Sequence, residues 1–183
     1  MTDRSTHIPV GDGFAVRSLS VLDVDAIARY ANNRKVWRNL RDLFPHPYHR
    51  EDAAKFIAII EATDPETAFA IANEQEAVGV IGFTIQSDVL RRTAEIGYWL
   101  GEPFWGKGIA TRALVAVCRL VFSTSDIVRL TAPVFAWNLA SARVLEKAGF
   151  VREGVMRSAV IKDGEITDQL IYGRLRKDSG HYP

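Results

Sequence analysis

Apolar residues recur every three or four positions in four stretches of the chain and form seven shorter strand-like runs elsewhere. A recurrence every three or four positions is typical of a helix with one buried face, and a short apolar or alternating run is typical of a β-strand. The predicted helices cover residues 20–31, 50–62, 110–121 and 139–148. The predicted strands cover residues 14–19, 67–72, 78–86, 93–100, 128–135, 150–156 and 169–174. Their order, β-α-α-β-β-β-α-β-α-β-β, predicts an α/β or α+β fold with a mixed sheet.

Turn and capping signals separate these elements. Ser20, with Asp23 three residues later, predicts a helix start with a short capping box. Residues 73–76 are polar and predict a hairpin, whereas residues 33–48 are irregular. Neither a repeat nor a linker divides the chain, so we expect one domain over residues 1–183. We expect the first ~12 and the last ~6 residues to be loosely held.

Composition narrows the possible function classes. The chain is 48% hydrophobic and 25% charged, as in an ordinary globular protein. Its 23 basic and 22 acidic residues give a net charge of +1, which argues against a dedicated nucleic-acid binder. The single cysteine, Cys118, excludes an intrachain disulfide and a cysteine-based zinc site, and the four histidines lack metal-ligand spacing. We find no secretory apolar region and no apolar run of ~20 residues, so we expect no metal, no membrane partner and a cytoplasmic location.

A glycine-rich turn separates the strand predicted at 93–100 from the helix that follows it. It reads Trp105-Gly106-Lys107-Gly108-Ile109-Ala110-Thr111. Glycines let backbone amides approach a ligand closely, and the first amides of a helix have no partner within the helix. The turn therefore suits an anion such as a pyrophosphate, although it lacks the second half of a Walker A loop. Taken alone, it is explained equally well as a tight connection.

Four separated motifs change this balance. They are Phe-Pro-His-Pro-Tyr at 44–48, Glu-Ile-Gly-Tyr-Trp-Leu at 95–100, Trp-Gly-Lys-Gly-Ile-Ala at 105–110, and a stretch at 138–157 that contains Leu-Glu-Lys-Ala-Gly-Phe. In this order they resemble the GCN5-related N-acetyltransferase (GNAT) superfamily, and within it the RimJ/RimL-like branch. The resemblance covers about residues 12–177. It implies the GNAT fold, an α/β (α+β) fold with a mixed, mostly antiparallel, twisted sheet of about seven strands, about four helices, and splayed central strands.

The resemblance implies acetyl-CoA as co-substrate, with its pantetheine arm along the strand at 93–100 and its pyrophosphate on the glycine turn. The cofactor-binding residues implied are Tyr98, Trp99, Leu100, Trp105, Gly106, Lys107, Gly108, Ile109, Ala110, Thr111, Asn138 and Ser141. Simpler interpretations stay open for several of them. Tyr98 and Trp99 can equally be core residues, and Lys107 can be a solvated loop residue. Asn138 can cap the following helix.

The same resemblance implies direct attack of an amine on the thioester, with a backbone amide near Trp99 or Leu100 stabilising the oxyanion. Many relatives assist the departing thiolate with a tyrosine, but this chain has Leu145 at that position. Ser141 matches the serine that RimJ/RimL-like members have instead, so it is the candidate that assists the leaving group. A serine at this place also suits the start of a helix.

The general base is less defined by the motifs. Glu95 is the candidate that we carry forward, with Glu153 and Asp168 as further positions on core strands of the implied fold. A glutamate on a strand also commonly pairs with an arginine, and this alternative stays open for Glu95.

The acceptor site is expected in the irregular segment 33–48 together with the last hairpin. Trp37, Phe44 and Tyr48 are its candidate substrate-binding residues, among four basic side chains and one acidic one. The segment either selects an acceptor with negative charge or is a solvated basic turn anchored by aromatic rings. The expected acceptor is the N-terminal α-amine of a protein; the alternatives are a small amine or antibiotic, or a non-catalytic acyl-CoA-binding module. A homodimer is also held open.

Overall fold

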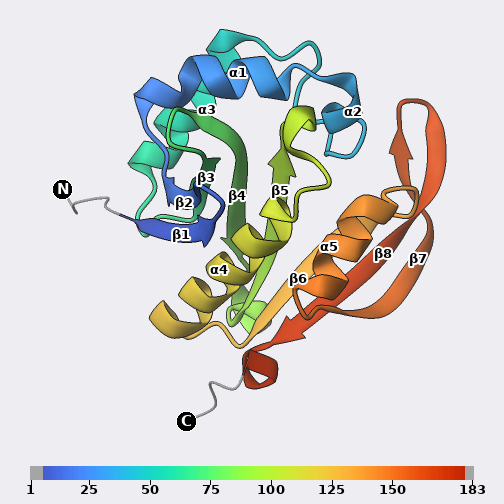
Figure 1. Ribbon diagram of the computed structural model, residues 1–183. Coiled ribbons are helices and arrows are strands. Elements are labelled where there is room, and N and C mark those ends of the chain that lie inside the picture. Colours follow the sequence, from blue (N-terminus) through green and yellow to red (C-terminus); the bar gives the residue numbers. More distant parts are fainter. Residues whose placement is uncertain (1–5, 180–183) are drawn as a thin grey trace.

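The computed structural model describes residues 6–179, which form one eight-stranded sheet with helices on both faces (Figure 1). The strands are β1 (His7–Gly11), β2 (Phe14–Ser18), β3 (Ala68–Ala72), β4 (Ala77–Ile85), β5 (Thr93–Leu100), β6 (Arg129–Phe135), β7 (Val151–Lys162) and β8 (Glu165–Leu175). Their spatial order is β1-β2-β3-β4-β5-β6-β8-β7. The α-helices are α1 (Val24–Ala31), α2 (Arg34–Trp37), α3 (Arg50–Ala62), α4 (Ile109–Thr124) and α5 (Leu139–Lys147).

Two hydrophobic cores hold the helices to the sheet. On one face, α1 and α3 pack over β3 and β4 around residues such as Ile27 and Ile57. On the other face, α4 and α5 cover the sheet around Leu114, Val117 and Leu145. The buried residues of α4 recur every three or four positions, which is the spacing that predicted this helix.

The centre of the sheet opens between β5 and β6. All neighbouring strands are antiparallel except this pair, which is parallel. Its pairing is limited to three positions, from Thr93↔Arg129 to Glu95↔Thr131, and the two strands then diverge (Figure 1). The predicted splay of these strands is therefore confirmed.

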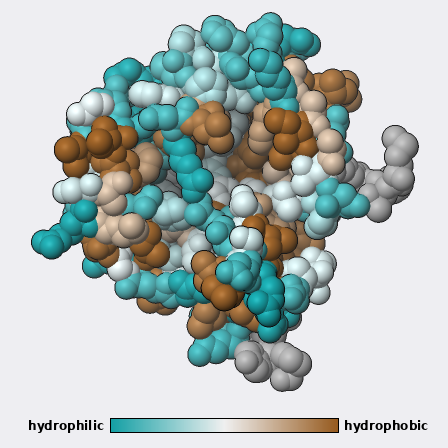
Figure 2. Space-filling view, turned by 180° about the vertical axis from the view of Figure 1, so that it is seen from behind, coloured by the Kyte–Doolittle hydropathy of each residue, from teal (hydrophilic) through white to brown (hydrophobic). Residues whose placement is uncertain are grey.

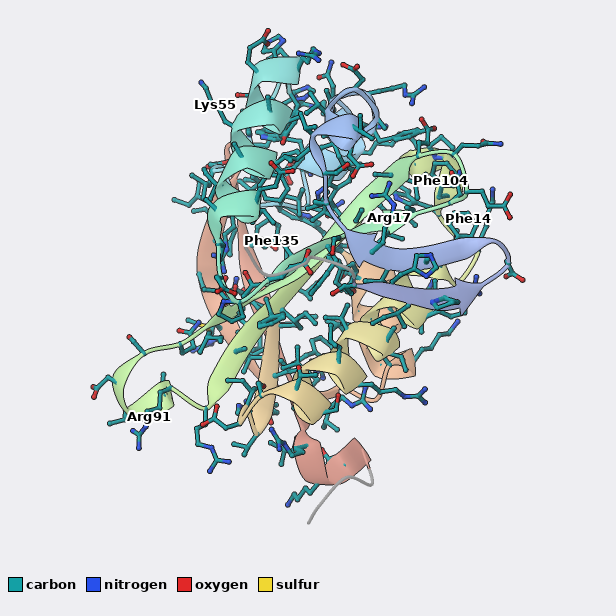
Figure 3. The ribbon with its side chains drawn as sticks, turned by 90° about the vertical axis from the view of Figure 1, so that its left-hand side faces the viewer. Phe14, Arg17, Lys55, Arg91, Phe104 and Phe135 are labelled. Carbon is teal, nitrogen blue, oxygen red and sulfur yellow. The ribbon has the colours of Figure 1, made fainter. Side chains whose placement is uncertain are left out.

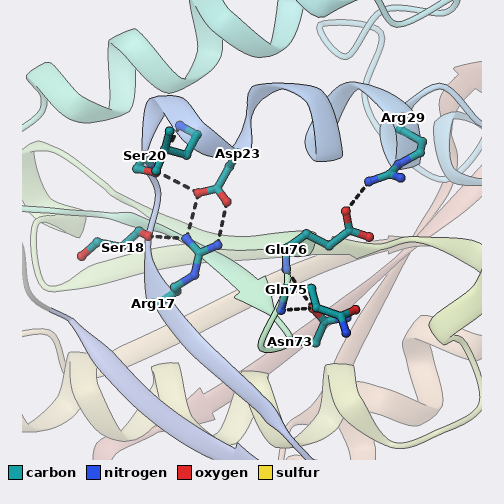
Figure 4. Close-up of polar contacts among 9 residues, drawn as sticks. Arg17, Ser18, Ser20, Asp23, Arg29, Asn73, Gln75 and Glu76 are labelled. Atoms are coloured by element: carbon teal, nitrogen blue, oxygen red, sulfur yellow. Dashed lines mark hydrogen bonds and ion pairs between the residues drawn. The ribbon is translucent and has the colours of Figure 1, made fainter.

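The capping box that the sequence predicted is present, and it caps the short 3-10 helix Val21–Asp23 that leads directly into α1. Asp23 is buried and accepts a hydrogen bond from the Ser20 backbone N–H. It also accepts two hydrogen bonds from Arg17, at 2.6 and 2.8 Å (Figure 4). These hydrogen bonds raise the pKa of the Arg17 guanidinium above its ordinary value, because they stabilise its charged form. The ion pair joins β2 to the first turn after it.

The N-terminal segment corrects one expectation. Residues 7–11 were expected to be loose, but they form β1, whose Val10 is buried. The turn into β2 uses Asp12 and Gly13, both with positive φ, and an Asp-Gly pair is a hairpin signal. Phe14 of β2 then lies beside Phe104, with ring centroids 6.1 Å apart (Figure 3).

Other differences are smaller. The segment expected to be irregular contains the one-turn helix α2, and the last two strands are longer than predicted. None of the helices between residues 6 and 179 has the length and apolar character needed to cross a bilayer. The face opposite to that of Figure 1 is mainly hydrophilic, with separate hydrophobic patches (Figure 2).

Candidate active site

The glycine turn lies between β5 and the N-terminus of α4. Gly106 and Gly108 have φ values of 75° and 72°, a conformation that other residues seldom adopt. Gly106, Lys107 and Gly108 are exposed, and Gly108 is the N-cap of α4 without any side-chain cap. The first amides of this 16-residue helix lie beside Gly106, which has open space around it, and beside Arg112, whose guanidinium donates a hydrogen bond of 3.3 Å to the Lys107 carbonyl. This is the arrangement that suits a pyrophosphate.

The other residues of the turn differ in how deeply they are buried and in what they contact. Ile109 is buried in the core under α4, whereas Ala110 and Thr111 are half-buried in its first turn. The Trp105 indole N–H donates a hydrogen bond of 2.6 Å to the Leu100 carbonyl, which ties the turn to the end of β5. The Lys107 ammonium lies 5.7 Å from the centroid of the Phe104 ring.

Main-chain direction decides which amides of β5 face the gap. The Gly101 N–H and the Thr93 carbonyl bond to β4 or its extension, so odd-numbered residues turn their main-chain groups to that side. The even-numbered residues Tyr98 and Leu100 therefore turn theirs toward β6, where the strands have separated. The amide of Leu100 thus faces the gap and that of Trp99 faces β4, and contact of the Leu100 amide with an oxyanion stays a prediction.

Ser141 lies beside this gap and contacts Tyr98. The two hydroxyl oxygens are 2.9 Å apart, and the Tyr98 hydroxyl is also 3.3 Å from the Ser141 carbonyl oxygen. Burial raises the pKa of Tyr98 far above its ordinary value, so the phenol keeps its proton; it donates to the Ser141 carbonyl, and either hydroxyl of the 2.9 Å pair can be the donor. The sequence indicated that Tyr98 either binds the cofactor or belongs to the core. It did not indicate this contact, because the two residues are 43 positions apart.

Asn138 has the capping role that the sequence left open. Its side-chain oxygen accepts a hydrogen bond of 3.1 Å from the Ser141 N–H, at the start of α5. The Ser141 hydroxyl takes no part in this cap. Leu145, at the position of the usual tyrosine, is fully buried in the core. Tyr98 and Ser141 thus bring two hydroxyls together on this side of β5.

The opposite face of β5 carries the remaining predicted residues. Trp99 packs against Phe44, with ring centroids 5.9 Å apart, and Phe44 packs against Tyr48 at 4.6 Å. Tyr48 is buried, so its ring supports Phe44 from the core. Glu95 forms an ion pair with Arg41, the alternative weighed against a role as base. Contact of any of these side chains with an acceptor stays a prediction.

Acidic partners neutralise the basic segment. Arg34 pairs with Asp163 at 2.5 Å, Arg38 pairs with Glu165 at 2.8 Å, and Lys35 pairs with Glu102. The bonds from Lys35 and Asn33 lower the pKa of Glu102 below its ordinary value. These contacts favour the solvated basic turn over a site that selects a negatively charged acceptor.

Lys162, at the end of β7, is a residue to which the sequence analysis gave no role. Its side chain is 1% exposed, its ammonium lies 3.6 Å from the centroid of the Trp37 ring, and it donates to Asp42 at 2.7 Å. Trp37 also stacks on His46, at 5.5 Å. The end of β7 is thus held to the segment around α2 by a buried cation, an arrangement that a lysine in a hairpin did not suggest.

Comparison with known proteins agrees with this geometry. The acetyltransferase (GNAT) domain family matches residues 14–151. The ribosomal-protein-serine acetyltransferase of Escherichia coli is 34% identical over 107 residues, which cover 58% of this chain and 59% of that protein. The chain therefore matches about three fifths of that relative's length. The E. coli [ribosomal protein uS5]-alanine N-acetyltransferase is 31% identical over 152 residues, covering 78% of this chain and 76% of that protein.

A solved structure with the same fold contains coenzyme A. It is RimL, a ribosomal L7/L12 α-N-protein acetyltransferase in complex with coenzyme A, with a TM-score of 0.81 and 27% identity over 93% of this chain and 98% of that one. The fold and the glycine turn thus define the class, a domain of the acetyltransferase (GNAT) type. This chain belongs to the GNAT acetyltransferase family, as its motifs predicted.

Proposed function

We propose that the protein transfers the acetyl group of acetyl-CoA to a primary amine, and that this amine is the α-amine of a polypeptide N-terminus. The observation that carries the proposal is the open gap between β5 and β6, which has the glycine turn beyond Leu100 and the Ser141 hydroxyl at its side. The names of the two E. coli relatives, which specify serine and alanine acetylation on ribosomal proteins, support a polypeptide acceptor.

Each group of residues has its own role in the proposed reaction. Acetyl-CoA supplies the acetyl group as a thioester. The amides of residues 106–111 hold the pyrophosphate, and the Leu100 amide stabilises the carbonyl oxygen as it gains negative charge. Ser141 donates a hydrogen bond to the sulfur as the carbon–sulfur bond breaks, while Tyr98 orients its hydroxyl. The attacking nitrogen forms the new bond to carbon and gives its proton to water; Glu95, which is paired with Arg41, is the candidate carboxylate to accept that proton from the water.

An acceptor panel tests this function, with release of free CoA thiol as the signal. We expect turnover with pentapeptides that carry a free α-amine. The matched control is the same peptide with its α-amine already acetylated, which should release no thiol above background. Turnover with small amines alone would make the protein a small-molecule acetyltransferase. Tight acetyl-CoA binding without turnover of any amine would make it a non-catalytic acyl-CoA-binding module.

The proposal extends to partners and location. A polypeptide acceptor and acetyl-CoA are the partners, and a net charge of +1 with ion-paired basic residues gives no reason to add a nucleic acid. We include the cytoplasmic location expected from the sequence, whose single cysteine, Cys118, is buried. Neither a membrane partner nor a homodimer is needed for the chemistry, and the homodimer stays a prediction.

A further inference from the structure

For most glycines, the backbone conformation or the nearby atoms explain why no larger residue stands at that position. There are 13, of which Gly180 lies outside residues 6–179. Six have positive φ: Gly11, Gly13, Gly106, Gly108, Gly149 and Gly164. In four more a Cβ would come within 3.0 Å of another atom: Gly79, Gly82, Gly101 and Gly173. Two remain, Gly154 and Gly97, and Gly154 lies at an irregularity in the pairing of β7.

Gly97 has none of these reasons. It lies within the regular pairing of β5 with β4, and a Cβ built on it would have no heavy atom within 4 Å. Its backbone is outside the positive-φ region, and the residue is exposed. Glycine weakens the interior of a strand, and there it often marks a place where a ligand approaches the backbone closely.

The neighbours of Gly97 define a slot. Side chains alternate along a strand, so Glu95 and Trp99 share its face. Arg41 pairs with Glu95, and Phe44 packs on Trp99, so residues 41–44 contact β5 on both sides of Gly97 but leave the position above it open. The Cα atoms of residues 95 and 99 are separated by about 13 Å in an extended strand. The missing side chain leaves a space about one side chain wide.

The slot also lies where the reaction needs an entrance. Glu95 is the last residue of β5 that pairs with β6, so Gly97 is at the mouth of the gap. Tyr98, the next residue, points to the other face and meets Ser141. An amine that enters over Gly97 therefore reaches the gap from the face opposite to the hydroxyls that serve the sulfur.

We propose that Gly97 is a specificity-determining residue, and that the slot over it admits the acceptor amine together with the slender stem that carries it. This inference rests on the proposed function and names the place of its acceptor. It predicts that a side chain at position 97 blocks the acceptor without disturbing either the fold or acetyl-CoA.

The test uses Gly97→Ala and Gly97→Val, with Gly154→Ala as matched control, since its Cβ also has open space around it. An acceptor that occupies the space over Gly97 would have to share it with one or more added methyl groups, which corresponds to about a 5- to 150-fold loss of kcat/KM for the peptide, least for alanine. The dissociation constant for acetyl-CoA should stay within about twofold, and the melting temperature should be unchanged or rise by up to about 4 °C. Gly154→Ala should keep wild-type kcat/KM.

A folded Gly97→Val protein with the kcat/KM of the wild type would overturn the proposal that the acceptor enters over Gly97. A wild-type protein that acetylates no amine contradicts the proposed function, and calorimetry then decides the slot separately. A free α-amine pentapeptide, titrated into the protein with bound CoA, should bind to wild type and lose affinity with Gly97→Val. Equal binding by both proteins, or binding by neither, overturns the slot as well.

Discussion

Replacing Ser141 by alanine removes the hydroxyl that we assign to the departing sulfur and leaves the start of α5 intact. The helix cap is the Asn138 side chain, which bonds to the backbone N–H of residue 141, and alanine keeps that N–H. The lost contact is the one to the Tyr98 hydroxyl, at 2.9 Å. A change in turnover can therefore be separated from a change in helix capping.

The size of the effect follows from the bond that is lost. A hydrogen bond to a charged atom contributes about 1.5–3 kcal/mol, and 1.36 kcal/mol is a factor of ten in rate. Ser141→Ala should thus lower kcat and kcat/KM together by about 10- to 10²-fold, with acetyl-CoA affinity nearly unchanged. Tyr98→Phe removes a neutral bond worth about 0.5–1.5 kcal/mol, so it should cost about 2- to 10-fold.

The assay is steady-state release of CoA thiol, with the melting temperature measured on the same preparations. Because Tyr98 acts through Ser141, the double variant should be as slow as Ser141→Ala within about twofold. Ser123→Ala is the control, since that hydroxyl bonds only to a carbonyl of its own helix, at 3.0 Å. Full turnover in a folded Ser141→Ala protein would refute the assignment, and additive losses in the double variant would refute the link between the two hydroxyls.

Three further predictions follow from other contacts. Gly108→Asp should weaken acetyl-CoA binding in calorimetry by at least about tenfold relative to Gly108→Asn, because both side chains tolerate positive φ and only aspartate repels the pyrophosphate; equal affinities would contradict the site. Burial raises the pKa of Tyr48 to about 12 in the folded protein, whereas the ordinary pKa of a tyrosine is near 10. The buried phenol therefore contributes fully to the free energy of unfolding below about pH 10, and this contribution is lost as the pH rises toward 12. Denaturant titrations should show a shallower alkaline loss in Tyr48→Phe, and an unchanged slope would argue against this cause. Asp23→Asn should lower the free energy of unfolding by about 2–4 kcal/mol, since it leaves Arg17 without its buried partner, and a loss below about 0.5 kcal/mol would show the pair to be dispensable.

The sequence predicts the elements best where local signals define them. The periodic apolar face of α4, its glycine turn and the capping box at Ser20 are each written within a few consecutive residues. β1 was missed because it is five residues long and includes Pro9, and its pairing depends on β2. The splay of β5 and β6 came from the family resemblance, since no local pattern encodes where two distant strands separate.

The sequence proposed residue types for the candidate site but not the contacts among them. Asn138 and Ser141 were singled out, but the partner of Ser141 is supplied by another strand. The burial of Lys162 against Trp37 likewise depends on packing between segments more than 100 residues apart. Gly97 went unnoticed because an unneeded glycine can be recognised only when the space around its Cα is known.

In the proposed reaction, strand β5 keeps the acceptor and the departing sulfur on opposite faces, because its side chains alternate. Tyr98 faces α5 and the sulfur side, while Gly97 and Trp99 face the segment from Arg41 to Phe44. A shift of one residue in the pairing with β4 would exchange these two sets, because it would turn every side chain of β5 to the other face. Seven uninterrupted pairs fix that register, and Gly79 lets the main chain of β5 approach β4 closely at one end. Part of the catalytic arrangement is therefore encoded in β4, a strand that contributes no group to the chemistry.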